Sequence, residues 1–138
     1  MENTESELIE SANAVIARSQ YQTIVTSGGH ALVADEPVKS DGTDTGMNPF
    51  SLLLASLASC TVITLRMYIN RKMWPIDEIR ADIEMFKTPN GTRIETKLSF
   101  KGEINAEQRE RLLKIADACP VHKILVGNIA INTVIQNP

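Results

Sequence analysis

The sequence has few of the residue types that most often carry catalysis, and it lacks several features that define protein classes. Among 138 residues there are two cysteines, two histidines and one tryptophan, and aromatic residues make up 4%. The net charge is -3 and the basic residues form no block or stripe, so we expect no nucleic-acid partner. The longest apolar run, residues 52–58, is too short to span a bilayer, so we expect no membrane partner.

Motifs of several enzyme classes are also missing. The chain has no Gly-x-Ser-x-Gly segment of a serine hydrolase and no glycine-rich phosphate loop. His30, Cys60, Cys119 and His122 are the only histidines and cysteines, and no pair of them has the spacing of two metal ligands. We therefore expect no metal and no cofactor. The functional question turns on the two cysteines, Cys60 and Cys119.

The acidic start of the chain bears on where the protein acts. Residues 1–5 lack the basic region and the following apolar stretch of a secretory signal, so we expect a cytoplasmic protein. In that compartment a purely structural disulfide is unusual, whereas a catalytic or transient one is possible. We expect residues 1–10 to be loosely held and residues 1–138 to form a single domain.

Antiparallel strands are predicted before residue 35. Residues 14–17 favour a strand, with a short helix as the alternative, and residues 20–27 favour a second strand. The Gly28-Gly29 pair predicts a hairpin turn, after which residues 31–34 return as a strand. Residues 35–48 read as a turn-rich loop.

A long helix is predicted over residues 49–72. Asn48 is a suitable N-cap, Pro49 suits the first helical position, and apolar and small residues recur at helical spacing. Arg71 and Lys72 place positive charge in the last turn, and Pro75 prevents continuation. A helix this long and this apolar should be central to the fold.

The remaining segments complete an α+β pattern. Alternating apolar and polar residues predict a hairpin of two strands, 79–85 and 94–100, joined near Asn90. Asn105 caps a following helix, with Gln108 at the capping-box position. A short helix over residues 121–126 and a final strand over residues 129–133 end the predicted order, which is typical of an α+β fold with antiparallel pairing.

The two thiols allow different interpretations from local sequence alone. Cys60, inside the long helix, is either a small buried hydrophobe or a reactive thiol, and no cation lies beside it in the sequence. Cys119 precedes Pro120, so it borders a helix N-terminus, where the helix dipole and free amides favour a thiolate. His122 lies near the same helix end as a proton partner. The alternative is that Cys119 merely caps the helix and His122 merely packs.

Two long motifs resemble the OsmC/Ohr superfamily. The first runs from Asp35-Glu36-Pro37 through Gly46-Met47-Asn48-Pro49 into Leu-Leu-Leu-Ala-Ser-Leu-Ala-Ser-Cys60-Thr, and ends at Arg71-Lys72-Met73-Trp74-Pro75. The second is Ala116-Asp117-Ala118-Cys119-Pro120-Val121-His122-Lys123. The resemblance covers about residues 20–135 and is closest to the general OsmC-like branch.

This resemblance implies both a fold and an activity. The fold would be an intertwined homodimer, with antiparallel sheets wrapped around long central helices. The activity would be that of a thiol peroxidase acting on organic hydroperoxides in oxidative-stress defence. The peroxidatic residue would be Cys60, which becomes a sulfenic acid, and the resolving residue Cys119, which forms a disulfide with it. An external dithiol would reduce that disulfide, without metal or flavin.

The chain departs from the superfamily pattern at the start of the long helix. The peroxidases have Asn-Pro-Glu there, whereas this chain has Asn48-Pro49-Phe50. We expect Arg18 to stabilise the Cys60 thiolate, and Glu36, or Asp35, to substitute for the missing acid. Phe50 would line an apolar substrate pocket together with His122, or would simply belong to the core. The missing acid supports two alternatives: an OsmC-fold protein that binds an apolar ligand without turnover, and a thiol–disulfide switch.

Overall fold

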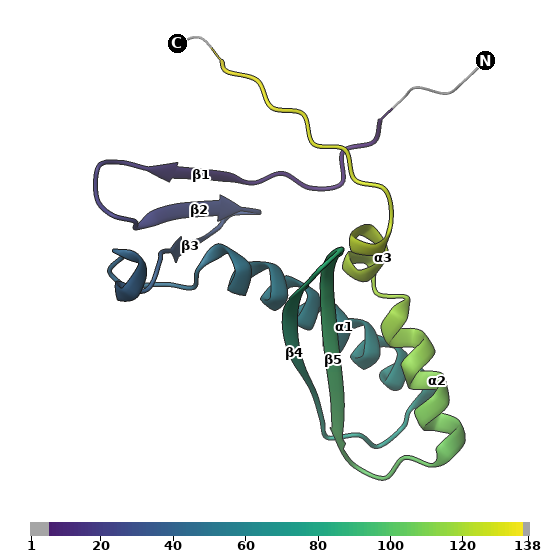
Figure 1. Cartoon of the computed structure of the whole chain (residues 1–138). Helices are drawn as coiled ribbons and strands as arrows, with labels where there is room; N and C mark the ends of the chain where they lie inside the picture. The colour runs from purple at the N-terminus through teal and green to yellow at the C-terminus, as the bar shows by residue number, and fades with distance from the viewer. Residues whose placement is uncertain (1–5, 137–138) are drawn as a thin grey trace, which may run out of the picture. The chain divides into compact units, whose positions relative to one another are not determined.

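The structure, a computed structural model, describes residues 6–136, which form two compact units that divide between Leu52 and Leu53. The elements labelled in Figure 1 are β1 (Asn13–Ile16), β2 (Thr23–Ser27), β3 (His30–Ala34), a short 3-10 helix (Val38–Ser40), α1 (Pro49–Lys72), β4 (Glu78–Thr88), β5 (Gly91–Lys101), α2 (Ala106–Asp117) and α3 (Pro120–Val126). Residues 1–5 of the segment expected to be loosely held lie outside the described residues. Residues 6–10 form neither helix nor strand.

The first unit is built on an antiparallel sheet with the strand order β1-β2-β3. The glycine pair joins β2 to β3 as predicted, and both glycines have positive φ angles, 57° at Gly28 and 78° at Gly29. Residues 13–16 form a strand, so the alternative of a short helix is wrong. The second strand begins at Thr23 and is shorter than the predicted range of 20–27.

The loop after β3 is organised around the buried carboxylate of Asp35, which is 2% exposed. One carboxylate oxygen accepts hydrogen bonds from the backbone N–H groups of Tyr21 (3.1 Å) and Glu36 (2.7 Å). The other accepts from the Thr45 hydroxyl (2.6 Å), the Thr45 N–H (3.1 Å) and the Thr43 hydroxyl. Hydrogen bonds from the Thr43 and Thr45 side chains hold the pKa of Asp35 far below its usual range.

The helix α1 has the predicted bounds, and its ends show why. The side chain of Asn48 accepts a hydrogen bond from the Ser51 N–H at 2.8 Å, which satisfies one free donor of the first turn. At the other end Met73 takes a left-handed conformation (φ 57°), and the Trp74 N–H donates to the Ile69 carbonyl at 3.1 Å. This arrangement closes the helix and turns Trp74 back along it.

By length and composition, α1 would also be able to cross a membrane. Its most apolar window has a mean hydropathy of 1.7, and 22% of that window is buried. Core helices of globular folds pass the same test, and α1 buries one stripe of residues spaced by four: Leu57, Thr61, Leu65 and Ile69. That spacing places all four on one helix face, which is typical of a helix packed on other elements.

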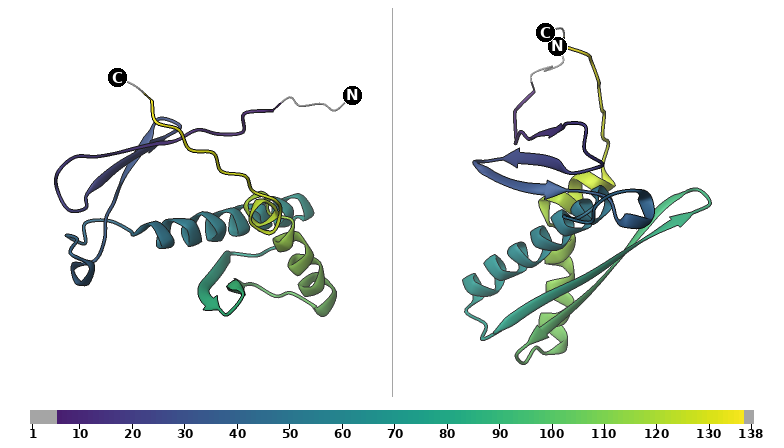
Figure 2. Two further views of the ribbon diagram at one scale, coloured as in Figure 1. Left: turned by 45° about the horizontal axis from the view of Figure 1, so that its top comes forward. Right: turned by 90° about the vertical axis from the view of Figure 1, so that its left-hand side faces the viewer.

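The core of the second unit forms where α1, the β4–β5 hairpin and α2 meet (Figure 2). Its buried residues are Leu65, Ile69, Ile76, Leu112 and Ala116. The hairpin pairs Glu78 with Lys101 at one end and Thr88 with Gly91 at the other, and it has the predicted alternation of half-buried apolar and exposed polar residues. The hairpin is therefore longer than predicted, but its antiparallel pairing and wet face are confirmed.

The helices α2 and α3 follow the sequence signals closely. The Asn105 side chain accepts from the Gln108 N–H at 2.7 Å, and the Gln108 side chain accepts from the Asn105 N–H at 2.9 Å. This reciprocal pair is the predicted capping box. The next helix begins at Pro120 rather than Val121, and Gly127 follows its last residue.

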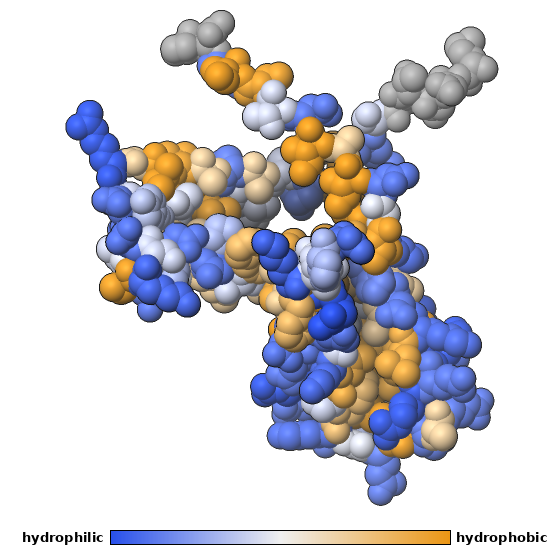
Figure 3. Space-filling model, in the orientation of Figure 1, coloured by the Kyte–Doolittle hydropathy of each residue, from blue (hydrophilic) through white to orange (hydrophobic). Residues whose placement is uncertain are grey.

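The predicted final strand over residues 129–133 is absent, which corrects the sequence prediction. Residues 128–136 form neither helix nor strand, and Ile129, Ile131, Val134 and Ile135 are 54–94% exposed. Figure 3 shows hydrophobic residues along this C-terminal segment. Alternating apolar residues favour a strand only where a sheet edge pairs with them, and the described residues show no such pairing here.

Candidate active site

The two cysteines are in contact although they are 59 positions apart. The Sγ atoms of Cys60 and Cys119 lie 2.7 Å apart, with the Cys119 thiol as donor to the Cys60 sulfur. Both are free thiols. Cys60 lies in the middle of α1. Cys119 stands in the break between α2 and α3, where its N–H donates to the Ala116 carbonyl (3.2 Å) and Pro120 starts the next helix. The contact places the two sulfurs next to each other, as disulfide formation requires.

The first turn of α3 faces Cys60 rather than Cys119. The Val121 N–H, a free donor of the helix N-terminus, lies 3.5 Å from the Cys60 Sγ. Cys119 is the N-cap residue, but its side chain accepts no capping hydrogen bond. The predicted helix end is therefore correct, but its amide serves Cys60 and not the thiol to which the prediction assigned it.

The surroundings of Cys60 oppose its ionisation overall. Burial raises the pKa of the Cys60 thiol, and contact with Cys119 raises it further. Hydrogen bonds from the Val121 N–H and the Thr64 side chain act in the opposite direction and lower this pKa. No cation appears among the groups that shift the pKa of Cys60 within the described residues. Among the described residues, the groups that favour a Cys60 thiolate are therefore these two hydrogen-bond donors.

The two thiols differ in access to solvent. Cys119 is fully buried, whereas Cys60 is only half-buried. The Thr61 hydroxyl lies 4.0 Å from the Cys119 sulfur and donates to the Leu57 carbonyl at 2.8 Å. One side of Cys119 is therefore occupied by a hydroxyl group that is already hydrogen-bonded to the backbone. A reagent arriving from solvent meets Cys60 first.

The other predicted site residues do not join the thiols in the same way. The Nδ1 atom of His122 lies 4.0 Å from a carboxylate oxygen of Asp117, and no hydrogen bond between His122 and either sulfur is present among the described residues. Arg18, Glu36 and Phe50 belong to the first unit. Their roles at the thiols remain predictions.

Three polar groups around the sulfurs, on Val121, Thr61 and Thr64, were not predicted from the sequence. Part of the signal was present, because Thr64 is four residues after Cys60 and so shares its helix face. Pro120 at the first helical position also leaves the next N–H without a helical partner. That this N–H meets Cys60 depends on how α3 packs on α1, which local sequence does not encode.

Together, fold and site define an α+β protein in which a long helix carries one free cysteine against a second at the start of a short helix. Residues 42–134, more than half of the chain, match the family model described as OsmC-like protein. The chain belongs to this family. No curated protein matches the chain in sequence.

Solved structures confirm the fold. An OsmC-like protein from Mycoplasma pneumoniae is similar with a TM-score of 0.74 and 19% identity, covering 88% of this chain and 90% of that one. An organic hydroperoxide resistance protein from Legionella pneumophila, also called a predicted redox protein, has a TM-score of 0.60 and 22% identity over 90% and 93%. The organic hydroperoxide resistance protein OhrB of Bacillus subtilis has a TM-score of 0.58 and 24% identity over 88% and 93%.

Proposed function

We propose that the protein is a thiol-dependent peroxidase that reduces organic hydroperoxides in the cytoplasm as a defence against oxidative stress. The observation that carries this proposal is the 2.7 Å contact between a half-buried thiol, Cys60, and a fully buried one, Cys119. Their difference in exposure supports first attack by Cys60 and resolution by Cys119. Two thiols with a purely structural role would need no such difference in exposure to solvent.

The proposed cycle has three balanced steps. The Cys60 thiolate attacks the terminal oxygen of the hydroperoxide, the O–O bond breaks, and the alcohol leaves with a proton while Cys60 becomes a sulfenic acid. The Cys119 thiol then attacks the Cys60 sulfur, which forms the disulfide and releases water. An external dithiol reduces the disulfide by two thiol exchanges and is itself oxidised. This chemistry uses sulfur alone and requires no metal or flavin.

The substrate class rests on the relatives' names as well as on the site. Two structurally similar proteins are named for organic hydroperoxide resistance, and the present chain shares their fold at 22% and 24% identity. Identity at this level supports the fold, so organic hydroperoxides are a proposal for this chain. The half-buried position of Cys60 beside the uncharged residues of α1 favours an organic over an ionic substrate.

Formation of the Cys60 thiolate is the step for which the described residues of the second unit supply no stabilising cation. Burial raises the pKa of Cys60. We propose that Arg18 supplies the positive charge that would lower it. Glu36 would hold Arg18 in place of the acid that Phe50 replaces. Phe50, which is 70% exposed in the chain alone, would form an apolar wall of the substrate pocket, and His122 would lie at its edge.

We also propose that the functional form is a homodimer. Ile63 and Met67 on α1 are 52% and 61% exposed, and the C-terminal isoleucines are 54–94% exposed. A second copy would cover this apolar surface. Sedimentation equilibrium should give twice the mass of the chain, and a monomer across the accessible concentration range would contradict the dimer.

Intact mass and thiol counting before and after one equivalent of cumene hydroperoxide test the peroxidase. The wild-type protein should lose both thiols and the mass of two hydrogens, as an internal disulfide requires. Cys119→Ser should instead gain one oxygen at Cys60 that a sulfenic-acid reagent traps. Cys60→Ser should keep Cys119 reduced, since that thiol is buried. Peroxide consumption by Cys60→Ser at the wild-type rate would overturn the assignment.

Binding of an apolar ligand without turnover is the second candidate function. The exposed Phe50 at the start of α1, where related peroxidases have an acid, is the observation that favours it. In that case both thiols would stay reduced in the same experiment. A third outcome, a disulfide that forms with oxidised dithiols but not with peroxide, would identify a thiol–disulfide switch.

A further inference from the structure

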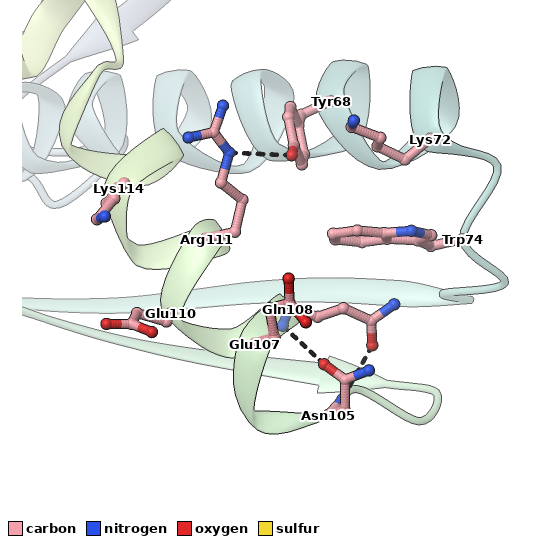
Figure 4. Close-up of a pocket in the computed structure, with 9 residues that line it drawn as sticks. All are labelled: Tyr68, Lys72, Trp74, Asn105, Glu107, Gln108, Glu110, Arg111 and Lys114. Carbon is pink, nitrogen blue, oxygen red and sulfur yellow. Dashed lines mark hydrogen bonds between the residues drawn. The ribbon is translucent and has the colours of Figure 1, made fainter.

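A pocket beside the C-terminal half of α1 combines aromatic rings with cations (Figure 4). Its volume is about 550 Å³, which lies within the usual range for small-molecule sites. The aromatic and charged residues that line it are Tyr68, Lys72 and Trp74 at the end of α1, and Glu107, Glu110, Arg111 and Lys114 on α2. Tyr68 lies eight residues beyond Cys60, about 12 Å along the helix, so this pocket is separate from the thiol pair.

The aromatic wall of the pocket is held in place by several contacts. The ring centroids of Tyr68 and Trp74 lie 5.6 Å apart in an edge-on arrangement, with 79° between the ring planes. The Lys72 ammonium and the Arg111 guanidinium each lie 5.7 Å from the Tyr68 ring centroid. Both rings are half-buried. Together they form a fixed apolar surface against which a planar group can pack.

Arg111 is oriented with part of its hydrogen-bonding capacity unused. Its Nε donates to the Tyr68 hydroxyl at 3.1 Å, which fixes the guanidinium plane. Its terminal N–H groups have no partner among the described residues, and they form the fork that binds a carboxylate with two parallel hydrogen bonds. Lys114 follows one turn later on α2. Neither Arg111 nor Lys114 nor Lys72 lies within 4.0 Å of a carboxylate oxygen in the part of the chain that the structure describes.

The charges around the pocket limit the ligand further. Three cations and two carboxylates, Glu107 and Glu110, line it, so its net charge is small and positive. A ligand with one negative charge suits that balance better than a multiply charged phosphate. The N-terminus of α2 offers no anion site either, because the Asn105 side chain already accepts from the Gln108 N–H.

We propose that this pocket binds a small organic anion with a planar apolar body, of the class of aromatic monocarboxylates. The carboxylate would pair with Arg111 and Lys114, and the ring would pack on Trp74. This site is independent of the peroxidase proposal, because it shares no residue with the thiol pair.

Benzoate is a suitable probe, since Trp74 is the only tryptophan of the chain and its fluorescence reports on this pocket alone. Titration of the full chain should change that fluorescence in a saturable way, and equilibrium dialysis should give the same affinity. Benzyl alcohol, which lacks the charge, should bind at least about tenfold more weakly, because it forms no charge-assisted hydrogen bond. Benzylammonium should not bind. Equal binding of all three probes, or no binding of benzoate, would overturn the proposal.

Variants locate the site. Arg111→Gln should weaken benzoate binding by about tenfold or more, and Arg111→Lys should weaken it less, because a lysine keeps the charge but not the fork. Lys114→Gln, at an exposed position, should also weaken benzoate binding. This variant removes a positive charge from the pocket but leaves the hydrogen bond from Arg111 to Tyr68 in place. Lys87→Gln, an exposed lysine on β4, is the matched control and should bind benzoate like the wild type. An equal loss in the control, or full affinity in both Arg111→Gln and Lys114→Gln, would contradict the assignment.

Discussion

The two units of the chain are stabilised in different ways. In the first unit the buried residues are Ala34 and Asp35, and the centre of its loop is a carboxylate with hydrogen-bond donors on both oxygens. In the second unit the buried residues are mainly apolar, and they form one cluster between α1, the hairpin and α2. The first unit is thus organised by hydrogen bonds and the second by packing.

This difference shows which unit can hold its structure without further contacts. Several large apolar residues on the strands of the first unit remain half exposed or more, for example Val15 at 65% and Ile24 at 50%. A three-stranded sheet with so little buried apolar area is marginal on its own. The second unit carries both the thiol pair and a packed core. We infer that the first unit depends on surface supplied by a second copy, in line with the proposed homodimer.

The largest effect on stability should come from Leu65→Ala in the core of the second unit. Leu65 is 0% exposed, and its removal leaves a cavity among Ile69, Ile76 and Leu112. Substitutions of this kind cost about 2–5 kcal/mol of unfolding free energy, which chemical denaturation measures. Leu113→Ala, at a position 56% exposed on α2, is the matched control and should cost less than about 1 kcal/mol. Equal costs would mean that the cluster is not the core.

Asp35 should make the stability of the first unit sensitive to acid. Its pKa is far below the unfolded value of about 3.9, so its contribution is fully present above about pH 5 and is lost as the pH falls through and below about 4. Asp35→Asn should lower the midpoint of chemical denaturation at neutral pH. An amide would place its own N–H groups against the Thr43 and Thr45 donors, and these donors would lose their acceptor. The difference from wild type should narrow as the pH falls.

The control for this titration is Asp82→Asn. Asp82 pairs with Arg80 at 2.9 Å on the exposed face of the hairpin, and that contact lowers its pKa as well. Because both side chains are exposed, the change in the denaturation midpoint should be small at every pH. An acid profile of Asp35→Asn that runs parallel to the wild-type profile would show that Asp35 does not titrate with folding.

Much of the fold was predictable because its signals are local. Asn48, Pro49 and Pro75 fix the ends of α1, and the alternation of residues gives the hairpin its wet face. The final strand was predicted wrongly for the opposite reason: alternation at Ile129 and Ile131 describes one strand but not the edge that would pair with it. A strand forms only when two segments pair, and the residue pattern of one segment does not show whether a partner edge is available.

At the site, too, the identity of the important residues was predictable from local sequence, whereas their tertiary contacts were not. The sequence predicted that function depends on Cys60 and Cys119, the family resemblance supplied their separate roles, and the structure places the two thiols in contact. Spacing alone gave no reason for that contact. The donation of the Val121 N–H to Cys60 was not predicted either, because it depends on the packing of α3 against α1. Such contacts can reverse a local expectation about which thiol a helix end serves.

A smaller effect, on rate rather than on stability, should follow from Arg18→Ala, which tests whether the first unit contributes to the chemistry of the second. If Arg18 supplies a stabilising cation, its removal should raise the apparent pKa of Cys60 and leave less thiolate near neutral pH. The rate of sulfenic acid formation, measured in the Cys119→Ser background, should fall about tenfold and recover as the pH rises. Arg93→Ala, on the exposed face of β5, should leave the pH–rate profile unchanged. A profile of Arg18→Ala that coincides with that of its background would exclude Arg18 from the site. The thiolate would then rely on Val121 and Thr64 alone, and the second unit would hold the complete chemistry.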